Sequence, residues 1–460
     1  MLHRRKSLFF KTAMLTIFMT GCVSLDPHYQ RPPAPIPKTW PGQDEDATAE
    51  SVLTDWKHVL LDPRLKVVIE RALISNRNLQ ESIADIEAAR ALYGEERAAL
   101  FPTLNAGLSY TRSHTASEGV TTSSEADNSV SSFELDLFGR NRSLARAAKE
   151  TWLASEATSQ NTRITLVAET ATAWITVAAD KSNLKLSRDT MDSASETLGI
   201  TQIQQREGSA SEGDVSSAMT TYQQARASVA AYQTLVTQDS NALNLLVGET
   251  VPQNLLPGRI ETLSPHAITL VPAGLSSDVL LRRPDVIEAE HSLKSVNADI
   301  GAARANFFPT ISLTASAGMG SSSLSNLFSH GGNVWSFAPS LTLPLFTGGS
   351  NMAQLQYANA EKKGLIAAYE KAIQTAFEDV ADALARRDTI NDQMNAQELA
   401  VISAQHSFDI SRRSFEVGTG DYLTELTAQR TLWSTQIELV SLQQTDFENR
   451  ITLWESLGGG

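Results

Sequence analysis

The sequence predicts a mostly α-helical chain with a smaller β part suited to a membrane, built twice on one plan. Three observations lead to this prediction. Apolar residues recur every seven positions over long segments, four short segments alternate apolar and polar residues, and matching stretches recur about 207 residues apart. Sevenfold spacing is typical of helices packed as coiled coils, and strict alternation is typical of strands. We therefore expect packed helices and strands in two copies.

The internal repeat is clearest where a helix is expected to lead into a strand. The stretch RAALFPTL at 97–104 matches RANFFPTI at 304–311, and the Gly-Asp pair at 213–214 matches the pair at 420–421. A long internal duplication defines an architecture. The predicted boundaries are 64–251 for the first repeat, 252–274 for a proline-containing linker, 275–457 for the second repeat and 458–460 for a C-terminal tail.

Each repeat is expected to contain one long helix and two helices of about half its length. A helix rises about 1.5 Å per residue, so the long segments reach about 100 Å and the short ones roughly 50–55 Å. Two short helices stacked end to end then match one long helix. The long helices are predicted at 141–206 and 350–414, and the short ones at 64–100, 214–247, 275–308 and 421–457.

Each repeat also contains two alternating segments, which we interpret as tilted strands of an outer-membrane barrel. They lie around 104–111, 132–137, 311–317 and 335–345. A soluble, half-buried hairpin shows the same alternation. We favour the membrane interpretation because the loops expected at 113–128 and 320–333 are long and rich in Ser, Thr and Gly, as the outer loops of such barrels are.

Four strands are too few to close a barrel, since closure takes about eight. Lipid offers no hydrogen-bond partners, so an open sheet edge is excluded within a membrane. The chain is therefore expected to assemble with copies of itself. Strand counting leaves the number of copies open, and three copies would supply about twelve strands. Glu134 and Asp136 are expected to face the interior and to attract cations there.

The N-terminus is interpreted as a secretion signal followed by a lipid anchor. A basic run at 4–6 precedes an apolar stretch at 12–20 that is too short to span a bilayer. Cys22, the single cysteine, follows small residues. We expect 1–21 to be removed and Cys22 to carry a diacylglycerol and an acyl chain such as palmitate, an anchor that does not span the membrane. The alternative is an incidental cysteine.

The residues after Cys22 bear on location. Val23 stands where an Asp would favour retention at the inner membrane, so the outer membrane is expected. Prolines are dense between residues 27 and 41, which favours an extended chain. We predict a lipid-anchored N-terminal tether and equatorial segment over 22–63.

Charge and motifs argue against several classes of function. The formal net charge is −14, which argues against nucleic acid as a partner. The sequence contains no phosphate-binding G-x-x-x-x-G-K-[ST] loop and no G-x-S-x-G elbow. Its eight histidines lack metal-ligand spacing. We expect no enzyme activity, no catalytic or metal site, and no cofactor beyond the covalent lipid.

Several short motifs occur together over essentially the whole mature chain. They are Asp55-Trp56, Asp62-Pro63-Arg64-Leu65, Phe101-Pro102, Leu137-Phe138-Gly139-Arg140, Leu281-Arg282-Arg283-Pro284-Asp285, Phe308-Pro309 and Leu457-Gly458-Gly459-Gly460. In this combination the chain resembles the TolC-like outer-membrane factors, specifically the lipoprotein efflux subunits of tripartite export systems of the RND type.

This resemblance implies a homotrimer whose strands form a twelve-stranded outer-membrane β-barrel, continuous with a twelve-helix periplasmic coiled-coil α-barrel. It implies two protein partners besides outer-membrane lipid: a periplasmic adaptor, or membrane fusion protein, and an inner-membrane proton-driven pump. The chain would then be a passive exit channel for small amphiphiles such as drugs. The alternatives are a duct for type I protein secretion and, in a different class, a periplasmic coiled-coil adaptor or scaffold lipoprotein.

Glycines mark the reversals of two helical hairpins. They lie at Gly208 and Gly213 in the first repeat and at Gly418 and Gly420 in the second. By themselves they predict only turns, because glycine permits a tight reversal. The resemblance implies that these turns are the periplasmic tips, where the adaptor docks and the duct narrows.

The resemblance also implies gate residues beside the second turn. Leu423 aligns with an apolar constriction residue, Arg430 with a basic tip residue, and Thr427 stands where many relatives carry Asp. We hypothesise that ion pairs, each contributing about 0–1 kcal/mol, hold the closed state. The candidate charges are Asp214, Arg206, Asp421, Glu425 and Arg430. The alternative is a solvated tip without a gating role.

Overall fold

The structure is a computed structural model that describes residues 24–41, 55–117, 119–270, 276–329 and 332–459. The predicted signal peptide and Cys22 lie outside the described residues. The chain divides into two compact units. We call residues 1–33, 84–156 and 287–370 the strand unit, and residues 34–83, 157–286 and 371–460 the hairpin unit.

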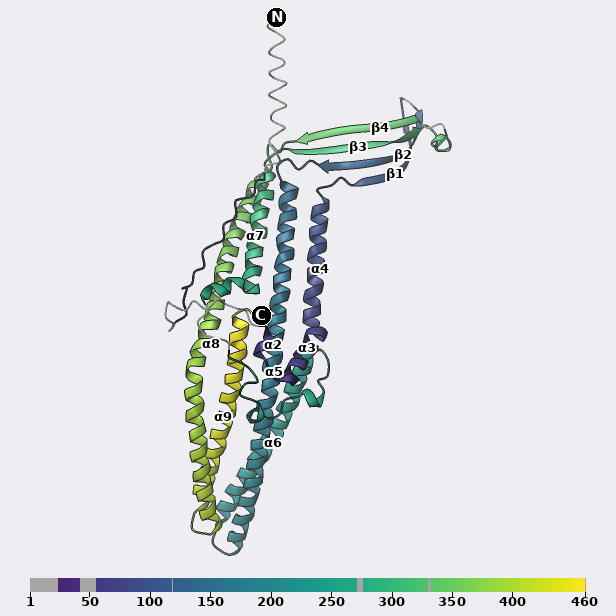
Figure 1. Ribbon diagram of the computed structural model, residues 1–460. Coiled ribbons are helices and arrows are strands. Elements are labelled where there is room, and N and C mark those ends of the chain that lie inside the picture. The colour runs from purple at the N-terminus through teal and green to yellow at the C-terminus, as the bar shows by residue number, and fades with distance from the viewer. Residues whose placement is uncertain (1–23, 42–54, 118, 271–275, 330–331, 460) are drawn as a thin grey trace. The chain divides into compact units, whose positions relative to one another are not determined.

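The strand unit contains one antiparallel sheet in the order β1-β2-β3-β4 (Figure 1). The strands are β1 (Leu104–Thr115), β2 (Gly119–Glu134), β3 (Thr310–Ser321) and β4 (Gly332–Thr342). The two predicted repeats meet at its centre, where Val130 of β2 lies opposite Ala315 of β3. β1 and β4 are the edges, and every residue in both is exposed. The prediction of a mostly helical chain with four strands is confirmed for the described residues.

The first strand pair departs from its prediction. The prediction of a long loop at 113–128 is wrong, because only residues 116–118 separate β1 from β2. Ser and Thr are compatible with strands, and the hydroxyls of Ser113 and Thr121 bond across this pair at 2.9 Å. A bulge follows Val130, and Ser132 adopts φ 50°. β2 then ends at Glu134, short of the predicted 137.

Two carboxylates at and just beyond the end of β2 are held by arginines. Glu134 lies 3.4 Å from Arg140 and Asp136 lies 3.0 Å from Arg142. Asp136 also accepts hydrogen bonds from the backbone N–H groups of Asn141 and Arg142. A carboxylate at this position stabilises a helix N-terminus. Their charges are therefore balanced by arginines at a strand–helix junction, and the expectation that they face an interior stays a prediction.

The long helices begin and end close to the predicted residues. They are α5 (Arg140–Arg206) and α8 (Ser350–Glu416). Two of the short helices also match, as α6 (Glu212–Val247) and α9 (Tyr422–Ser456). The other two predicted helices are each broken, into α3 (Pro63–Ser75) with α4 (Arg77–Ala98), and into η4 (Ser277–Arg282) with α7 (Pro284–Ala305). None of the described helices is long and apolar enough to cross a membrane.

Both breaks have a local cause. Asn76 is extended, and its Oδ1 accepts a hydrogen bond from the N–H of Leu79 at 2.9 Å, so it ends α3 and caps α4. Its Nδ2 donates to the carbonyl of Leu246 at 2.8 Å, which ties this junction to the end of α6. In the second repeat, Pro284 forces Arg283 out of the helical region and opens α7 as a first helical residue.

The hairpin unit consists mainly of two antiparallel helical hairpins, one from α5 and α6 and the other from α8 and α9 (Figure 1). Its shorter elements are α2 (Trp56–Val59), η2 (Gln253–Leu255) and η3 (Ile260–Thr262); η5 (Leu324–Asn326) belongs to the strand unit. Trp174 of α5 is fully buried, and its indole N–H donates to the carbonyl of Leu255 at 3.0 Å. Ile260 and Ile268 are also buried, so the described part of the linker packs into the core.

The N-terminal segment is docked within the strand unit and is not a free tether over its described part. Asp26 accepts hydrogen bonds from Ser143 at 2.6 Å and from Arg146 at 2.7 Å. It lies so close to Gly301 that a Cβ there would stand 1.8 Å from its Oδ1. Farther along, Arg31 forms an ion pair with Glu290 of α7. These contacts hold residues 24–33 against α5 and α7.

The Arg-Arg-Pro-Asp motif acts as a clamp in the hairpin unit. The Arg283 guanidinium donates to the carbonyl of Ser456 at the end of α9 and lies 2.7 Å from Asp285. It also lies 3.6 Å from Asp379 of α8. One largely buried side chain therefore joins the segment before α7 to two further helices.

Candidate functional site

The two hairpin turns use the same backbone device. α5 ends at Arg206, and α8 ends at Glu416. Gly208 and Gly418 follow with φ of 79° and 76°, the left-handed conformation in which glycine carries no steric penalty. The predicted turns are thus present at both hairpins.

The other two predicted glycines differ in their roles. Gly213 is not part of the turn, since it lies in the first turn of α6. Gly420 stays in the turn, and a Cβ there would lie 2.9 Å from the Cβ of Ser414. Close approach of the chain therefore favours glycine at Gly420.

The acidic residues beside the turns serve as helix caps. In α6 the side chain of Ser211 accepts a hydrogen bond from the N–H of Asp214 at 3.1 Å, while Asp214 accepts one from the N–H of Ser211 at 2.8 Å. In α9 Asp421 accepts from the N–H of Thr424 at 2.9 Å and from its hydroxyl at 2.8 Å. The Ser211 hydroxyl and N–H lower the pKa of Asp214, and the Thr424 N–H and hydroxyl lower the pKa of Asp421. Hydrogen bonding as caps therefore keeps both carboxylates ionised to a lower pH than an ordinary aspartate.

The hypothesised ion pairs are not formed within the described chain. Arg206 donates instead to the carbonyl of Gln202 on its own helix at 3.3 Å. Arg430 is exposed and forms no salt bridge with a described residue. The physical reason is that backbone N–H groups at the helix starts already occupy Asp214 and Asp421.

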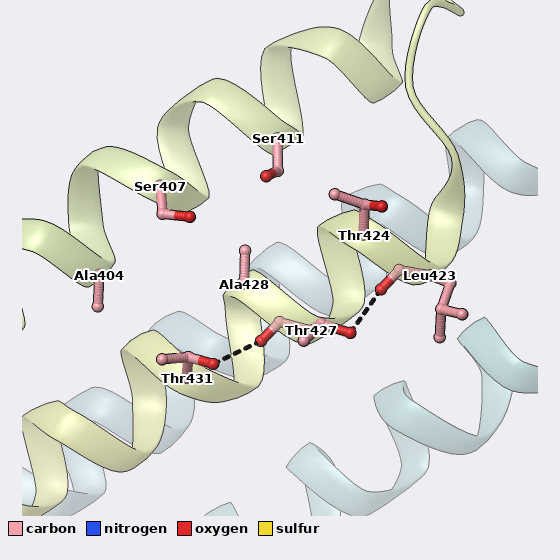
Figure 2. Close-up of a pocket in the computed structure, with 8 residues that line it drawn as sticks. All are labelled: Ala404, Ser407, Ser411, Leu423, Thr424, Thr427, Ala428 and Thr431. Atoms are coloured by element: carbon pink, nitrogen blue, oxygen red, sulfur yellow. Dashed lines mark hydrogen bonds between the residues drawn. The ribbon is translucent and has the colours of Figure 1, made fainter.

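A groove runs between α8 and α9 next to the second turn (Figure 2). Its volume is about 420 Å³, and it is lined by Ala404, Ser407, Ser411, Leu423, Thr424, Thr427, Ala428 and Thr431. Ser407 and Ser411 point from α8 toward α9, and Ala428 points back (Figure 2). The lining residues carry no charge and are nearly all small, so the groove suits a packed helix or side chain and supports no catalysis.

Leu423 and Thr427, the two predicted gate residues in this groove, differ in character. Leu423 is 69% exposed although it is a large apolar side chain. The hydroxyl of Thr427 donates to the carbonyl of Leu423 at 2.7 Å, and Thr431 repeats this bond to Thr427 at 2.9 Å. Because the hydroxyls of Thr427 and Thr431 donate to these carbonyls, they present no free hydrogen-bond donor to the groove. The structure thus brings Leu423 and Thr427 together but leaves Arg430 outside the groove lining.

Sequence reasoning missed the contacts that join the two hairpins. Arg412 of α8 forms an ion pair with Glu196 of α5. Gln429 of α9 donates to Ser193 of α5 at 3.1 Å. An apolar cluster lies beside these bonds and consists of Leu198, Ala218, Phe415, Tyr422 and Leu426. Two of its members, Ala218 of α6 and Leu426 of α9, each belong to a row of apolar residues with the sevenfold spacing typical of a packed seam, and those rows were the available signal.

Glu425 lies among these cross-hairpin contacts and not on the surface. Its exposed fraction is 0%. Its Oε1 accepts a hydrogen bond from the hydroxyl of Thr197 of α5 at 3.2 Å, and its Oε2 has no partner among the described residues. Burial raises the pKa of Glu425, against the opposing effects of Thr197 and Arg412. Glu425 was expected to be one of several surface acids, and this expectation is wrong. No group of His, Cys, Asp or Glu among the described residues could hold a metal ion.

Comparisons with known proteins point to one family. The family model described as outer membrane efflux protein matches residues 68–249 and 275–459. The antibiotic efflux pump outer membrane protein ArpC of Pseudomonas putida is 41% identical over 458 residues, covering 97% of this chain and 94% of the relative. The solvent efflux pump outer membrane protein SrpC of Pseudomonas putida is 40% identical over 459 residues, covering 97% of each.

A solved structure agrees with these relatives. The open state of the MtrE outer membrane channel of Neisseria gonorrhoeae superposes with a TM-score of 0.85 at 34% identity, covering 95% of this chain and 98% of that one. The match spans nearly all of both chains, so it includes the sheet and the hairpins. The chain belongs to the outer membrane efflux protein family, and it is accordingly an outer-membrane transport channel protein and not an enzyme.

Proposed function

We propose that three copies of this chain form the passive exit duct of a tripartite efflux pump and release small amphiphilic compounds across the outer membrane. The class of cargo is inferred from the relatives, one of which is named for antibiotics and another for solvents. A periplasmic adaptor and an inner-membrane proton-driven pump would supply the cargo and the driving energy.

The observation that carries the proposal is the open sheet of the strand unit. β1 and β4 pair on one side only within the described chain. Their outward side chains include Leu104, Leu108, Trp335, Phe337 and Leu341, all more than half exposed. In lipid the apolar face would be favourable, but the unpaired edges would not be tolerated. Pairing of β1 with β4 of another copy removes both edges, and three copies give twelve strands, enough for closure.

The hairpin unit supports the same assembly. Leu399, Ile402 and Ile410 of α8 are each at least half exposed. Their positions follow one side of the helix, and an exposed apolar stripe of this kind calls for a partner. Helices of neighbouring copies would cover it, and three chains would supply the twelve-helix α-barrel that continues the duct.

The chain's organisation is proposed as the sequence predicts it. The internal duplication, with repeats at 64–251 and 275–457, is supported by the two segments that the family model matches. A diacylglycerol and an acyl chain on Cys22 would anchor the tether after removal of residues 1–21. This anchor rests on the sequence pattern alone.

The tips of the hairpins are proposed as gate and adaptor-docking site. Gly208, Gly418 and Gly420 shape the turns that would meet the adaptor, with Gly213 just inside α6. Leu423 and Thr427 line the neutral groove and would form the constriction. The remaining candidates for the gate are Asp421, Asp214, Arg206 and Arg430. The two acids would act by capping α6 and α9, the helices next to the constriction.

Two measurements test the function. The full chain, purified in detergent and placed in planar bilayers, is expected to give an ion current. A deletion strain is expected to become more sensitive to antibiotics and organic solvents, and the full-length gene is expected to restore tolerance. Absence of current from correctly folded protein, together with unchanged sensitivity of the deletion strain, would contradict the proposal.

A further inference from the structure

We propose that Glu425 is a protonation-sensitive latch between the two hairpins, which holds them packed when it is neutral and loosens them when it is ionised. The inference rests on the proposed function, because it treats the hairpin end as the gate of the duct. It gives Glu425, which was expected to be one of the surface charges of the gate, a different role as a buried group.

The first support is the placement of the carboxyl group. Glu425 is completely buried beside the apolar cluster that joins the hairpins, next to Tyr422 and Leu426. One oxygen accepts a single hydrogen bond, from Thr197 on the opposite hairpin, and the other has no partner among the residues that the structure describes. Ionising the carboxyl group in such a site costs more hydration than the single hydrogen bond from Thr197 replaces, so the neutral form is favoured.

The second support is the distribution of charge around Glu425. Arg412 of α8 is the cation that acts on it, but this guanidinium is bound to Glu416 at 2.9 Å and paired with Glu196 of α5. Two carboxylates therefore share the one arginine, and Glu416 also repels a charge on Glu425. Proton uptake by Glu425 relieves this excess of negative charge.

Within the described part of the chain, α6 and the rest of α9 add no second cation to the site. α6 contributes Ala218 to the adjoining cluster, with Val215 and Tyr222 packed against it, while its acid Asp214 is held by Ser211 in the cap. On α9 itself, Asp421 is engaged with Thr424, and Arg430 is exposed. The balance of charges at Glu425 is thus set mainly by α5 and α8.

The direction of the pH effect follows from linkage. Burial raises the pKa of Glu425 in the packed state, whereas separated hairpins would return it to the ordinary range near 4.3. The packed state then holds its proton more tightly, so packing is favoured at low pH and this advantage is lost as pH rises through the raised pKa. Each unit of difference between the two pKa values changes the ratio of packed to loosened hairpins about tenfold.

Planar-bilayer recording of the full chain tests this inference. Wild-type open probability is expected to rise as pH increases from acidic to slightly alkaline values. Glu425→Gln stays neutral and is expected to remove this rise, leaving the channel as closed as the acidic wild type. Glu438→Gln, at an exposed glutamate of the same helix, is the matched control and is expected to keep the wild-type pH profile.

A second variant and a second readout guard against misfolding. Thr197→Val removes the hydrogen bond that favours the ionised form, so the midpoint of the wild-type profile is expected to move to higher pH. Amide hydrogen exchange compares wild type with Glu425→Gln at one alkaline pH, where residues 193–201 and 422–429 are expected to exchange more slowly in the variant. At acidic pH the two proteins are expected to match.

The possible outcomes distinguish a failure of the latch proposal from a failure of the proposed function. A conducting channel whose pH profile is the same in wild type, Glu425→Gln and Thr197→Val overturns the latch and leaves the proposed function standing. A profile that Glu438→Gln abolishes equally well also overturns it, because the effect would then be one of surface charge. A folded chain that conducts at no pH contradicts the proposed function itself.

Discussion

Each of the two units of this chain places some side chains against the usual rule: the strand unit exposes apolar residues, and the hairpin unit buries an acid. The strand unit exposes large apolar residues, with Trp335 of β4 at 78%, whereas the hairpin unit completely buries the acid Glu425. A sheet that displays tryptophan needs lipid on that side, and a core that contains an acid with an unpartnered oxygen is poised to respond to protons. The comparison teaches that the sheet depends on lipid for its stability, whereas the packing of the hairpins depends on pH.

The largest effect is expected from a charge on the apolar face of the sheet. Trp335→Arg should oppose membrane insertion by about 2–4 kcal/mol per copy near the bilayer midplane, and assembly multiplies this cost over the copies. Ser336→Arg is the matched control, because alternate residues of a strand face opposite sides. Yield of folded protein in outer membranes is the readout, and equal losses for the two variants would contradict a lipid-facing Trp335.

A smaller loss is expected in the hairpin unit, which should not need lipid for its own stability. Arg283→Ala leaves Asp285, Asp379 and the carbonyl of Ser456 without their shared donor. Because the two acids are partly exposed, we expect the free energy of unfolding to fall by about 2 kcal/mol, which is below the range for fully buried pairs. Urea unfolding in detergent measures it. Arg282→Ala, in the same motif but exposed, should stay within about 0.5 kcal/mol of wild type.

The caps of the hairpins are expected to contribute less again. Ser211→Ala removes one half of the reciprocal bonds with Asp214 and should lower the free energy of unfolding by about 1 kcal/mol. Ser217→Ala, farther along α6 and exposed, is the control and should not destabilise. An equal loss from Ser217→Ala would mean that helix propensity, and not capping, sets the effect.

The smallest effect is expected in the N-terminal segment and should appear only in acid. Burial alone would raise the pKa of Glu290, but hydrogen bonds from Arg31 and Lys294 lower it to about 2. A lowered pKa stabilises the native state above the ordinary glutamate pKa near 4.3 and loses that contribution as pH falls toward about 2. Proteolysis of residues 24–33 should therefore increase below about pH 4, and Glu290→Gln should show the increase already at neutral pH.

The long helices were the easiest elements to predict, because their sequence pattern extends over many turns. α5 and α8 begin and end within two residues of their predicted limits, because a sevenfold seam over many turns leaves little room for another structure. The breaks at Asn76 and Pro284 interrupt that pattern only locally. β2 was misjudged because its pairing depends on backbone bonds between polar strands, which side-chain alternation does not reveal.

The site was harder to predict than the fold. The turns follow from glycine, and Ser211-x-x-Asp214 is a readable capping signature, yet Asp214 and Asp421 were expected to form ion pairs. Glu425 could not be placed, because the seam through Leu426 describes one face of α9. In the structure α9 also packs through a second row containing Tyr422, Glu425 and Gln429. Only tertiary packing decides whether such a row is buried. The adaptor alternative is also set aside, because the chain belongs to the outer membrane efflux protein family.

The central claim is that lipid forces the open sheet to pair with other copies of the chain. Single cysteines placed along 106–111 of β1, each combined with Ser336→Cys in β4, test it by disulfide formation in outer membranes. At a matching position the account predicts cross-linked dimers and trimers and no larger product. Absence of cross-links at every position, cross-links confined to one chain, or ladders extending beyond three copies would contradict it.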